Sequence, residues 1–433
     1  MTQRYDTYKD SGVQWLGEIP GHWECTSLGR VLYEKLQYGA SESGDLEYTN
    51  DSMRYIRITD ITLDGKLKKD CCKYLSSEIG KNYPVRKGDV LLARSGATVG
   101  KAFIYNEDNE ACYAGYLIKA SIQQDKVFPT FFFYFTQTFQ YNEWKNRIFI
   151  QATIQNISAE KYTRMKLCIP PLSEQRSIVS FLDAKCGKID EWVTKKQKEV
   201  EHLQELKQRV IADAVTQGLN PHVKMKATNI PWLKEIPEHW EIKRLKYLVS
   251  CNDESLTNTE NPNLEINYVE IGDVNDINGI AHITKYRFED APSRARRKTR
   301  KDDVIVSTVR TYLKAIAKVP DNGIIVSTGF AVLRAIDVNS SYLAFCCISS
   351  NFIDSVVALS KGISYPAITA SELLNLFIPV PPLSEQRSIV SYLDAKCSKI
   401  DKLIANITKE IERIKEYKQR LISDVVTGEI KVC

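Results

Sequence analysis

Several features of membrane, secreted and metal-binding proteins are missing from this chain of 433 residues. No apolar run approaches the roughly 20 residues that a membrane helix needs, and the polar start, MTQRYDTYKDSG, lacks the apolar core of a signal peptide. The 11 cysteines contain no C-x-x-C, and the five histidines form no H-E-x-x-H and no grouping with cysteines. The composition therefore predicts a cytoplasmic protein with reduced thiols, no metal site and no membrane partner.

Motifs of two enzyme classes are missing as well. The chain has no glycine-rich cofactor fingerprint, and it lacks the Asn-Pro-Pro-aromatic tetrapeptide that adenine methyltransferases use. The stretch at 91–105 resembles a P-loop, but three residues rather than four separate Gly96 from Gly100. Ala102 also stands where that motif has Ser or Thr. We therefore expect no cofactor and no catalytic residues.

The bulk composition is ordinary for a soluble globular protein. Hydrophobic residues make up 43% of the chain and charged residues 26%, and the net charge is +5. The length predicts two to four domains. A mildly basic balance permits a nucleic-acid partner but does not require one.

The strongest positive feature is an internal repeat. At a displacement of 211 residues, PPLSEQRSIVSFLDAKCGKID at 170–190 matches PPLSEQRSIVSYLDAKCSKID at 381–401 in 19 of 21 positions. WLGEIPGHWE at 15–24 likewise matches WLKEIPEHWE at 232–241. The sequence between these blocks diverges. The chain is therefore predicted to be two units, each with a variable domain followed by a repeated segment.

Each repeated segment has the pattern of a long helix. A Pro-Pro pair precedes it, and Ser173 and Ser384 are the expected N-caps. Apolar residues recur at steps of three, four or seven, which is the spacing of a coiled-coil seam. In the second copy they are Ile389, Leu393, Ile400, Leu403, Ile407, Ile411, Ile414 and Leu421. We expect the two copies to pair antiparallel; the alternative is that each helix packs on its own domain.

This order of blocks closely resembles the specificity subunit of type I restriction–modification systems. The matching residues are IPPLSEQRSIV at 169–179, its copy VPPLSEQRSIV at 380–390, and both W-L-x-E-I-P-x-H-W blocks. The resemblance covers essentially the whole chain. It implies an α+β fold in which two α/β target-recognition domains are separated by two long antiparallel coiled-coil helices, with a pseudo-two-fold internal repeat.

The resemblance also implies domain boundaries and a role. We expect a first target-recognition domain at 1–168, a central helix at 169–217, a second target-recognition domain at 218–379 and a C-terminal helix at 380–433. Each domain would read one half of a bipartite site on double-stranded DNA, and the helices would set the gap between the halves. The chain would have no catalysis of its own. It would bind two methyltransferase subunits and restriction subunits that use ATP.

Three other functions compete with this one. A chain that cleaves or methylates DNA alone is disfavoured by the missing motifs. A coiled-coil scaffold that binds only protein partners is disfavoured by a basic run at 293–301 and by the divergence between the two domains. A specificity subunit of a related restriction system, with a fused methyltransferase–nuclease partner, also fits the block order.

Basic and polar segments supply the candidate DNA contacts, because phosphate contacts provide affinity and arginine forks read guanine edges. The basic candidates are Arg294, Arg296, Arg297, Lys298 and Arg300, expected in a loop, and the weaker group Lys66, Lys68 and Lys69. Polar turns between two strands, at 91–105 and 305–319, supply Arg94, Ser95, Thr98, Lys101, Thr308, Arg310, Thr311 and Lys314. Loops before each long helix supply Gln151, Thr153, Gln155, Asn156, Ser364 and Tyr365. For each, the alternative is an ordinary turn. The aromatic run at 128–135 is expected in the core.

The start of each repeated helix supplies candidate partner contacts. Two identical patches would hold two identical methyltransferases, provided that their side chains are exposed, as the pattern suggests. The candidates are Pro170, Pro171, Glu174, Gln175, Arg176, Pro381, Pro382, Glu385, Gln386 and Arg387. The alternative is that these residues serve helix capping and internal packing, and both roles can hold together.

Overall fold

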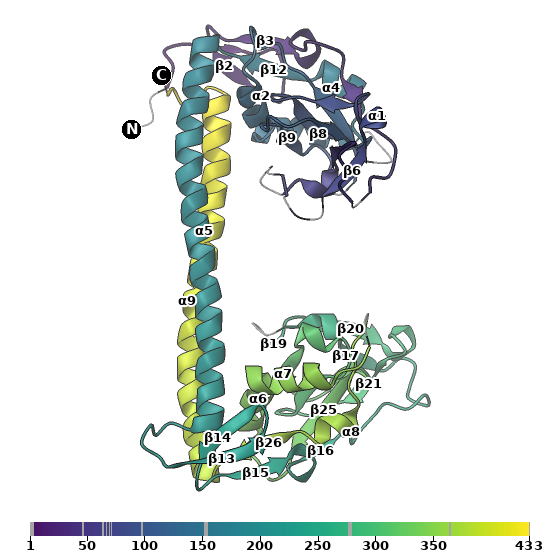
Figure 1. Ribbon diagram of the computed structural model, residues 1–433, viewed down its shortest axis with the longest axis vertical. Coiled ribbons are helices and arrows are strands. Elements are labelled where there is room, and N and C mark those ends of the chain that lie inside the picture. The colour runs from purple at the N-terminus through teal and green to yellow at the C-terminus, as the bar shows by residue number, and fades with distance from the viewer. Residues whose placement is uncertain are drawn as a thin grey trace. The chain divides into compact units, whose positions relative to one another are not determined.

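The computed structural model describes residues 4–45, 47–62, 65, 67–68, 70, 72–96, 98–150, 155–275, 279–362 and 365–432. The chain divides into two compact units, Met1–Lys195 with Glu410–Cys433, and Lys196–Lys409. Each unit contains one mixed α/β domain and a segment of each of two long helices, α5 (Leu172–Gln217) and α9 (Leu383–Val426) (Figure 1). The predicted fold class is confirmed.

Two four-stranded sheets form the domain of the first unit. Their orders are β4-β11-β8-β9 and β6-β5-β10-β7; β5 and β10 are parallel, and the other neighbours are antiparallel. The strands are β4 (Gln37–Tyr38), β5 (Ser52–Ile56), β6 (Lys73–Ser76), β7 (Pro84–Val85), β8 (Val90–Ala93), β9 (Ala102–Ile104), β10 (Ala111–Tyr113) and β11 (Leu117–Ala120). Strands β8 and β11 are buried along their whole length. Near-continuous apolar runs therefore replace the alternation of a half-exposed strand.

The domain of the second unit has the same strand connectivity. Its sheet orders are β16-β25-β22-β23 and β20-β17-β24-β21, and β17 and β24 are the parallel pair. The strands are β16 (Val249–Cys251), β17 (Glu265–Val269), β20 (Thr284–Arg287), β21 (Ala295–Lys298), β22 (Val304–Ser307), β23 (Ile316–Lys318), β24 (Ile324–Ser327) and β25 (Phe330–Ala335), with the hairpin β18 (Val274–Asn275) and β19 (Gly279–Ile280). Two divergent sequences thus share one topology.

Short helices cover these sheets in both units. They are α1 (Ser77–Gly80), α2 (Pro129–Phe135), α3 (Phe139–Ile150) and α4 (Ala159–Arg164) in the first unit, and α6 (Ser340–Ile348), α7 (Ser350–Leu359) and α8 (Ala370–Leu374) in the second. The aromatic run at 128–135 forms most of α2, where Phe131, Phe132 and Phe135 are buried, so its assignment to the core is confirmed. Among the described residues no single helix is long and apolar enough to cross a membrane; the bent pair α6 and α7 meets that test only by length and composition.

The repeated W-L-x-E-I-P-x-H-W block joins the ends of both long helices in the first unit. Its Trp23 indole is fully buried and donates its N–H to Glu174 Oε1, in the first turn of α5, at 3.0 Å. His22 Nε2 lies 2.8 Å from the other carboxylate oxygen. The same indole packs against Gly428, just beyond the end of α9, where a Cβ would lie 3.2 Å from the ring. The start of α5 is therefore fixed beside the end of α9.

The second unit repeats this arrangement with the helices exchanged. Trp240 donates to Glu385 in the first turn of α9 at 3.1 Å, and His239 lies 2.9 Å from the same carboxylate. Gly218 follows the end of α5, and a Cβ at this position would lie 3.0 Å from the Trp240 ring. Both glycines have φ near +80° (+75° and +81°), the left-handed conformation that ends helices at least cost. In both units the two helix segments therefore run antiparallel.

Strand pairs carry these blocks onto the domains. Strand β3 (Glu24–Ser27) pairs with β12 (Lys166–Ile169), which leads into α5, and β15 (Glu241–Arg244) pairs with β26 (Phe377–Val380), which leads into α9. The hairpins β1 (Tyr8–Asp10) with β2 (Glu18–Pro20), and β13 (Met225–Ile230) with β14 (Leu233–Pro237), complete each framework. The framework is therefore built from the repeated sequence blocks and the strands beside them.

A buried glutamine connects each long helix to its domain. The Gln175 side chain accepts from the Phe128 N–H at 2.7 Å and donates to the carbonyls of Lys126 (3.0 Å) and Pro170 (2.8 Å). Its copy Gln386 accepts from the Asn339 N–H at 2.8 Å and donates to the Pro381 carbonyl at 2.8 Å. In each unit the glutamine oxygen therefore accepts from a backbone N–H at the start of a domain helix, α2 or α6. These domain helices lie far in sequence from the long helix that carries the glutamine.

The expected exposure of the repeated helix start is therefore wrong for three of its residues. Gln175 is 0% exposed, Gln386 1% and Glu174 9%, because each side chain is used in internal hydrogen bonds. Pro170 and Pro381 are also buried, and Glu385 is half-buried. The exposed members of the two patches are Pro171, Arg176, Pro382 and Arg387.

Within each unit the two helix segments meet along an apolar seam. One ion pair between α5 and α9 accompanies the seam and recurs at equivalent positions in the two units. Lys418 on α9 lies 2.6 Å from Asp190 on α5 in the first unit, and Lys207 on α5 lies 2.7 Å from Asp401 on α9 in the second. These are the same two sequence positions with the helices exchanged. Antiparallel pairing of the repeated segments is thus confirmed within each unit.

Two local details of the predicted helices are wrong. Leu403 is 51% exposed, and Ile404 takes its place in the seam at 9% exposed. The buried positions Cys397, Ile400, Ile404, Ile407 and Ile411 alternate in steps of three and four, so Leu403 lies one position outside the stripe. Ser173 and Ser384 are not N-caps, because α5 and α9 begin at Leu172 and Leu383, one residue earlier in each copy.

We predict a large stability difference between neighbouring substitutions in this seam. Ile404→Ala removes a buried side chain and should lower the free energy of unfolding by roughly 2–4 kcal/mol. Leu403→Ala removes a half-exposed side chain and should cost less than about 1 kcal/mol. Urea denaturation followed by circular dichroism measures both. Equal losses would contradict the observed seam.

We also predict that Gln175→Ala destabilises the protein. The substitution leaves a backbone N–H and two carbonyls without their partner, at a cost of roughly 2–3 kcal/mol. Arg176→Ala, at the adjacent exposed position, is the matched control and should change stability by less than about 0.5 kcal/mol. Thermal unfolding of both variants is the measurement. A Gln175→Ala protein as stable as its control would show that these hydrogen bonds contribute nothing.

Candidate nucleic-acid interface

In the first unit two of the predicted candidate loops meet. The turn between β8 and β9 carries Arg94 and Ser95, and Ser95 forms an isolated antiparallel bridge with Asn156, in the segment before α4. The Ile157 N–H also donates to the Arg94 carbonyl at 2.8 Å. The strand–turn–strand prediction for 91–105 is confirmed. Residues more than 60 positions apart in sequence therefore form one polar surface.

The centre of this surface is an arginine stacked on a tyrosine. The Arg94 guanidinium carbon lies 4.7 Å from the centre of the Tyr38 ring, a cation–π geometry. The Tyr38 hydroxyl accepts from the Ala159 N–H at the start of α4, at 3.0 Å, and this bond fixes the ring. The Arg94 Nε and the Asn156 Oδ1 are buried without a hydrogen-bond partner. Tyr116, whose carbonyl accepts from the Arg94 N–H, is exposed beside them.

The other candidates of the first unit have mixed surroundings. Lys101 is half-buried, and its ammonium donates to the Ile61 carbonyl at 3.1 Å, so its charge is partly engaged inside the domain. Thr98 is half-buried, while Gln155 and Lys68 are exposed. The candidates Lys66, Lys69, Gln151 and Thr153 lie outside the described residues.

The second unit brings together the corresponding two loops. Val309 forms a bridge with Ala367, and the Ile368 N–H donates to the Thr308 carbonyl at 2.9 Å, as Ile157 does to Arg94 in the first unit. The Arg310 guanidinium lies 5.0 Å from the Tyr365 ring, and Tyr365 is 65% exposed. An arginine on a tyrosine thus recurs, although the tyrosine comes from another segment.

Backbone strain marks the turn of the second unit. Arg310 and Lys314 have φ of +52° and +51°, and they flank the short 3-10 turn Thr311–Leu313. The left-handed region is uncommon for residues with side chains, and such strain concentrates at functional sites. Tyr312, Leu313 and Lys314 are exposed at this turn. A large aromatic in a polar turn was the sequence signal for Tyr312, which the sequence candidates omitted.

Two predicted contacts of this turn are engaged internally. Thr311 is buried, and its hydroxyl donates to the Ser360 hydroxyl at 2.8 Å, so its candidacy as a DNA contact is wrong on accessibility. The Thr308 hydroxyl donates to the Gly329 carbonyl at 2.9 Å. Ser364 lies outside the described residues. Arg310, Lys314 and Tyr365 remain the exposed candidates of this surface.

The sequence predicted a loop for the basic run at 294–301, and this prediction is wrong. Residues Ala295–Lys298 form strand β21, which pairs with β24. A strand turns alternate side chains to opposite faces, so the charges of the run cannot act as one patch. The Arg296 guanidinium lies 4.9 Å from the Phe288 ring, and Arg297 Nε is buried. Arg294 precedes the strand and is exposed.

Acidic residues neutralise two further charges of this run. Arg300 lies 2.5 Å from Glu254, and Lys298 lies 3.3 Å from Glu260. Arg334, which also bonds Glu254 at 3.0 Å, lowers the pKa of that carboxyl, and Arg300 adds to the effect. Glu254 therefore stays ionised beside Arg300. The run is a weaker anion-binding surface than its composition suggested.

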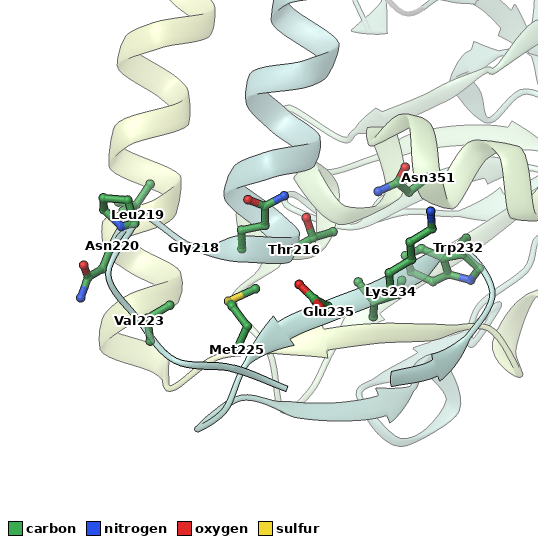
Figure 2. A pocket seen from close by; sticks show the side chains of 13 residues that line it. Thr216, Gly218, Leu219, Asn220, Val223, Met225, Trp232, Lys234, Glu235 and Asn351 are labelled. Carbon is green, nitrogen blue, oxygen red and sulfur yellow. The ribbon is translucent and has the colours of Figure 1, made fainter. Parts of the chain in front are cut away.

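The described residues contain no cluster of metal ligands. No group of three or more His, Cys, Asp and Glu side chains among them could hold a metal ion. A pocket of about 930 Å³ lies in the framework of the second unit, and its ionisable lining residues are Lys234 and Glu235, both exposed. Figure 2 shows them on β14, with Leu219 and Asn220 in the loop after α5 on the other side. This pocket is an open depression in the framework.

Comparison with known proteins finds relatives that match nearly the whole chain. The profile of the type I restriction modification DNA specificity domain matches residues 23–202 and 237–413. A Methanocaldococcus jannaschii protein named for the MjaX type I restriction enzyme specificity subunit is 26% identical, over 96% of both chains. The EcoBI specificity subunit of Escherichia coli is 23% identical, over 90% of this chain and 83% of its own.

The fold has a solved counterpart as well. A chain from a structural study of complex assembly in a type I restriction–modification system aligns with a TM-score of 0.69 and 19% identity. The alignment covers 95% of this chain and 99% of that one. Two matches to one domain profile agree with the two structural units and their shared strand order. The chain belongs to the type I restriction–modification DNA specificity family.

Proposed function

We propose that this chain reads a bipartite DNA site for a type I restriction–modification complex in the cytoplasm and has no catalytic residue of its own. One observation carries the proposal: two domains with the same strand order present different side chains from the same pair of loops. A constant scaffold with variable loops can recognise two different DNA sequences, because base readout depends on the side chains presented.

In this proposal Arg94 and Arg310 make the main base contacts. A guanidinium held against a tyrosine ring keeps its outer N–H groups free and has less side-chain entropy to lose on binding. Its fork matches the O6 and N7 acceptors of guanine. Lys314, Gln155, Lys68 and Arg294 are exposed and would contact phosphates. The engaged residues Lys298 and Arg300 would contribute less.

The repeated framework would dock the partners. Two exposed, identical patches around Arg176 and Arg387 suit two copies of one methyltransferase subunit, and restriction subunits would join that assembly. The proposed division of labour follows the expected boundaries: recognition at 1–168 and 218–379, framework at 169–217 and 380–433. The helices would set the unread gap between the two half-sites.

A methylation map tests this proposal. The chain is expressed with the methyltransferase subunit of its system in a host without DNA methylation, and modified bases are mapped by single-molecule sequencing. A split motif that requires both proteins supports the proposal. Methylation by this chain alone would contradict the absence of catalysis. If the co-expressed pair assembles without methylating or binding DNA, the scaffold alternative is favoured.

We predict that single arginine substitutions change one half-site only. Arg94→Gln should relax the sequence requirement in one half, and Arg310→Gln in the other, with a loss of discrimination of roughly 1–3 kcal/mol at one base pair. The same methylation map reads out both. Relaxation of both halves by either substitution would contradict the assignment of one domain to each half.

We further predict different salt dependences for two exposed basic residues. Lys314→Gln should reduce the slope of log affinity against log salt by about 1, since one phosphate contact is lost. Arg300→Gln is the matched control and should leave the slope nearly unchanged, because Glu254 already neutralises that charge. Fluorescence anisotropy with the assembled complex over a salt series measures the slopes. An unchanged slope for Lys314→Gln would remove it from the interface.

A further inference from the structure

Two cysteines face each other where the first framework block joins the start of α5. Cys25 on β3 stands directly opposite Cys168 on β12, in an antiparallel pair. Their sulfur atoms are 3.5 Å apart, and the Cys168 thiol donates to the Cys25 sulfur. Directly opposed residues on antiparallel strands have Cα atoms about 4.5–5.5 Å apart, within the range of about 4.4–6.8 Å that a disulfide spans. A bond between these sulfurs therefore needs little backbone movement.

The second unit lacks this feature at the equivalent place. In the matching strand pair β15 and β26, Ile242 stands opposite Pro379. The framework fold therefore does not require sulfur at these positions. Cys186 and Cys397, which occupy corresponding places in the two repeats, are buried in the helix seams. The pair at 25 and 168 is thus specific to the first unit and separate from the repeated pattern.

The two thiols differ in reactivity. Cys25 is half-buried and within reach of solvent, whereas Cys168 is buried. The hydrogen bond from Cys168 lowers the pKa of Cys25 to about 7, and the positive charges of Lys166 and Lys9 add to this effect. The same hydrogen bond, together with burial, raises the pKa of Cys168. Since the thiolate is the nucleophile, Cys25 is the attacking sulfur and Cys168 the resolving one.

We propose that Cys25 and Cys168 form an oxidisable dithiol that hydrogen peroxide converts to a disulfide. The Cys25 thiolate attacks one peroxide oxygen and the O–O bond breaks, which yields a sulfenic acid and hydroxide. The Cys168 sulfur then attacks the Cys25 sulfur, the S–O bond breaks, and the departing hydroxide takes the Cys168 proton as water. Two thiols are oxidised to one disulfide, and the peroxide is reduced to two waters.

The disulfide would crosslink β3 and β12 at the place where the first domain is attached to α5. Strand β3 follows Trp23, whose indole holds Glu174 at the start of α5, and β12 leads directly into the same helix. A covalent link between these strands would add to the non-covalent contacts that hold the first domain on the helix pair. The proposal concerns the framework and does not depend on which bases the loops read.

The test treats the native full-length protein with hydrogen peroxide, blocks free thiols with N-ethylmaleimide, and maps the digest by mass spectrometry. We expect one peptide pair joined through Cys25 and Cys168, lighter by two hydrogen atoms and separated again by dithiothreitol. In Cys168→Ser, dimedone should trap Cys25 as sulfenic acid. In Cys186→Ser, the joined pair should persist. If the wild-type protein yields both cysteines as separate alkylated peptides after peroxide, the proposal is overturned.

A second measurement needs no variant. Cys251 on β16 is half-buried like Cys25, but burial raises its pKa. At neutral pH, iodoacetamide should therefore label Cys25 roughly tenfold faster than Cys251 in the native protein. Equal labelling rates would show that Cys25 is not an activated thiolate, and they would contradict the proposed reaction with peroxide.

Discussion

The bond between a buried indole and a buried or half-buried carboxylate organises this protein. Trp23 on Glu174, and Trp240 on Glu385, attach each framework block to the first turn of a long helix. Each indole also contacts the glycine that ends the other helix. A large apolar ring with one N–H donor suits this place, because it fills the space between two helix ends while its polar edge satisfies the carboxylate. The antiparallel pairing in each unit follows from these contacts.

The repeated sequence at the helix start is accordingly explained by internal bonding. In the P-P-L-S-E-Q block the glutamate binds the tryptophan. The glutamine binds both the first proline of the block and the start of α2 or α6. Sequence identity between two copies therefore reflects identical internal tasks at these positions. Arg176 and Arg387 are identical and exposed in the two copies, and they remain the candidates for partner contacts.

The two loop surfaces around Arg94 and Arg310, in contrast, differ in sequence between the two domains. The strand order is the same in both domains, but the loops differ in side chains and backbone conformation. Arg94 and Arg310 converge on one device, an arginine supported by a tyrosine, although Tyr38 comes from a strand and Tyr365 from a loop. Side-chain chemistry at a fixed place in a fold can thus be reproduced by residues from different segments.

Much of this organisation could be predicted from the sequence by itself. The repeat, the apolar period of the helices and the block order determined the fold class and the family, because periodicity and repetition are local properties of the chain. The pairing of loops at 94–95 with 156, and at 309 with 367, was foreseen only as two separate sets of candidates. Tyr38 could not be foreseen as the support of Arg94, because it contacts the arginine across 56 positions of sequence.

Only the tertiary structure decided which polar residues are available. The side chains of Gln175, Gln386 and Thr311 are polar in sequence but buried in the fold, because each satisfies hydrogen bonds with segments distant in sequence. Arg300 and Lys298 are basic in sequence but paired with acids more than 30 positions away. Charge and polarity are properties of the chain, whereas solvent access and pairing are set by three-dimensional contacts that no local pattern contains.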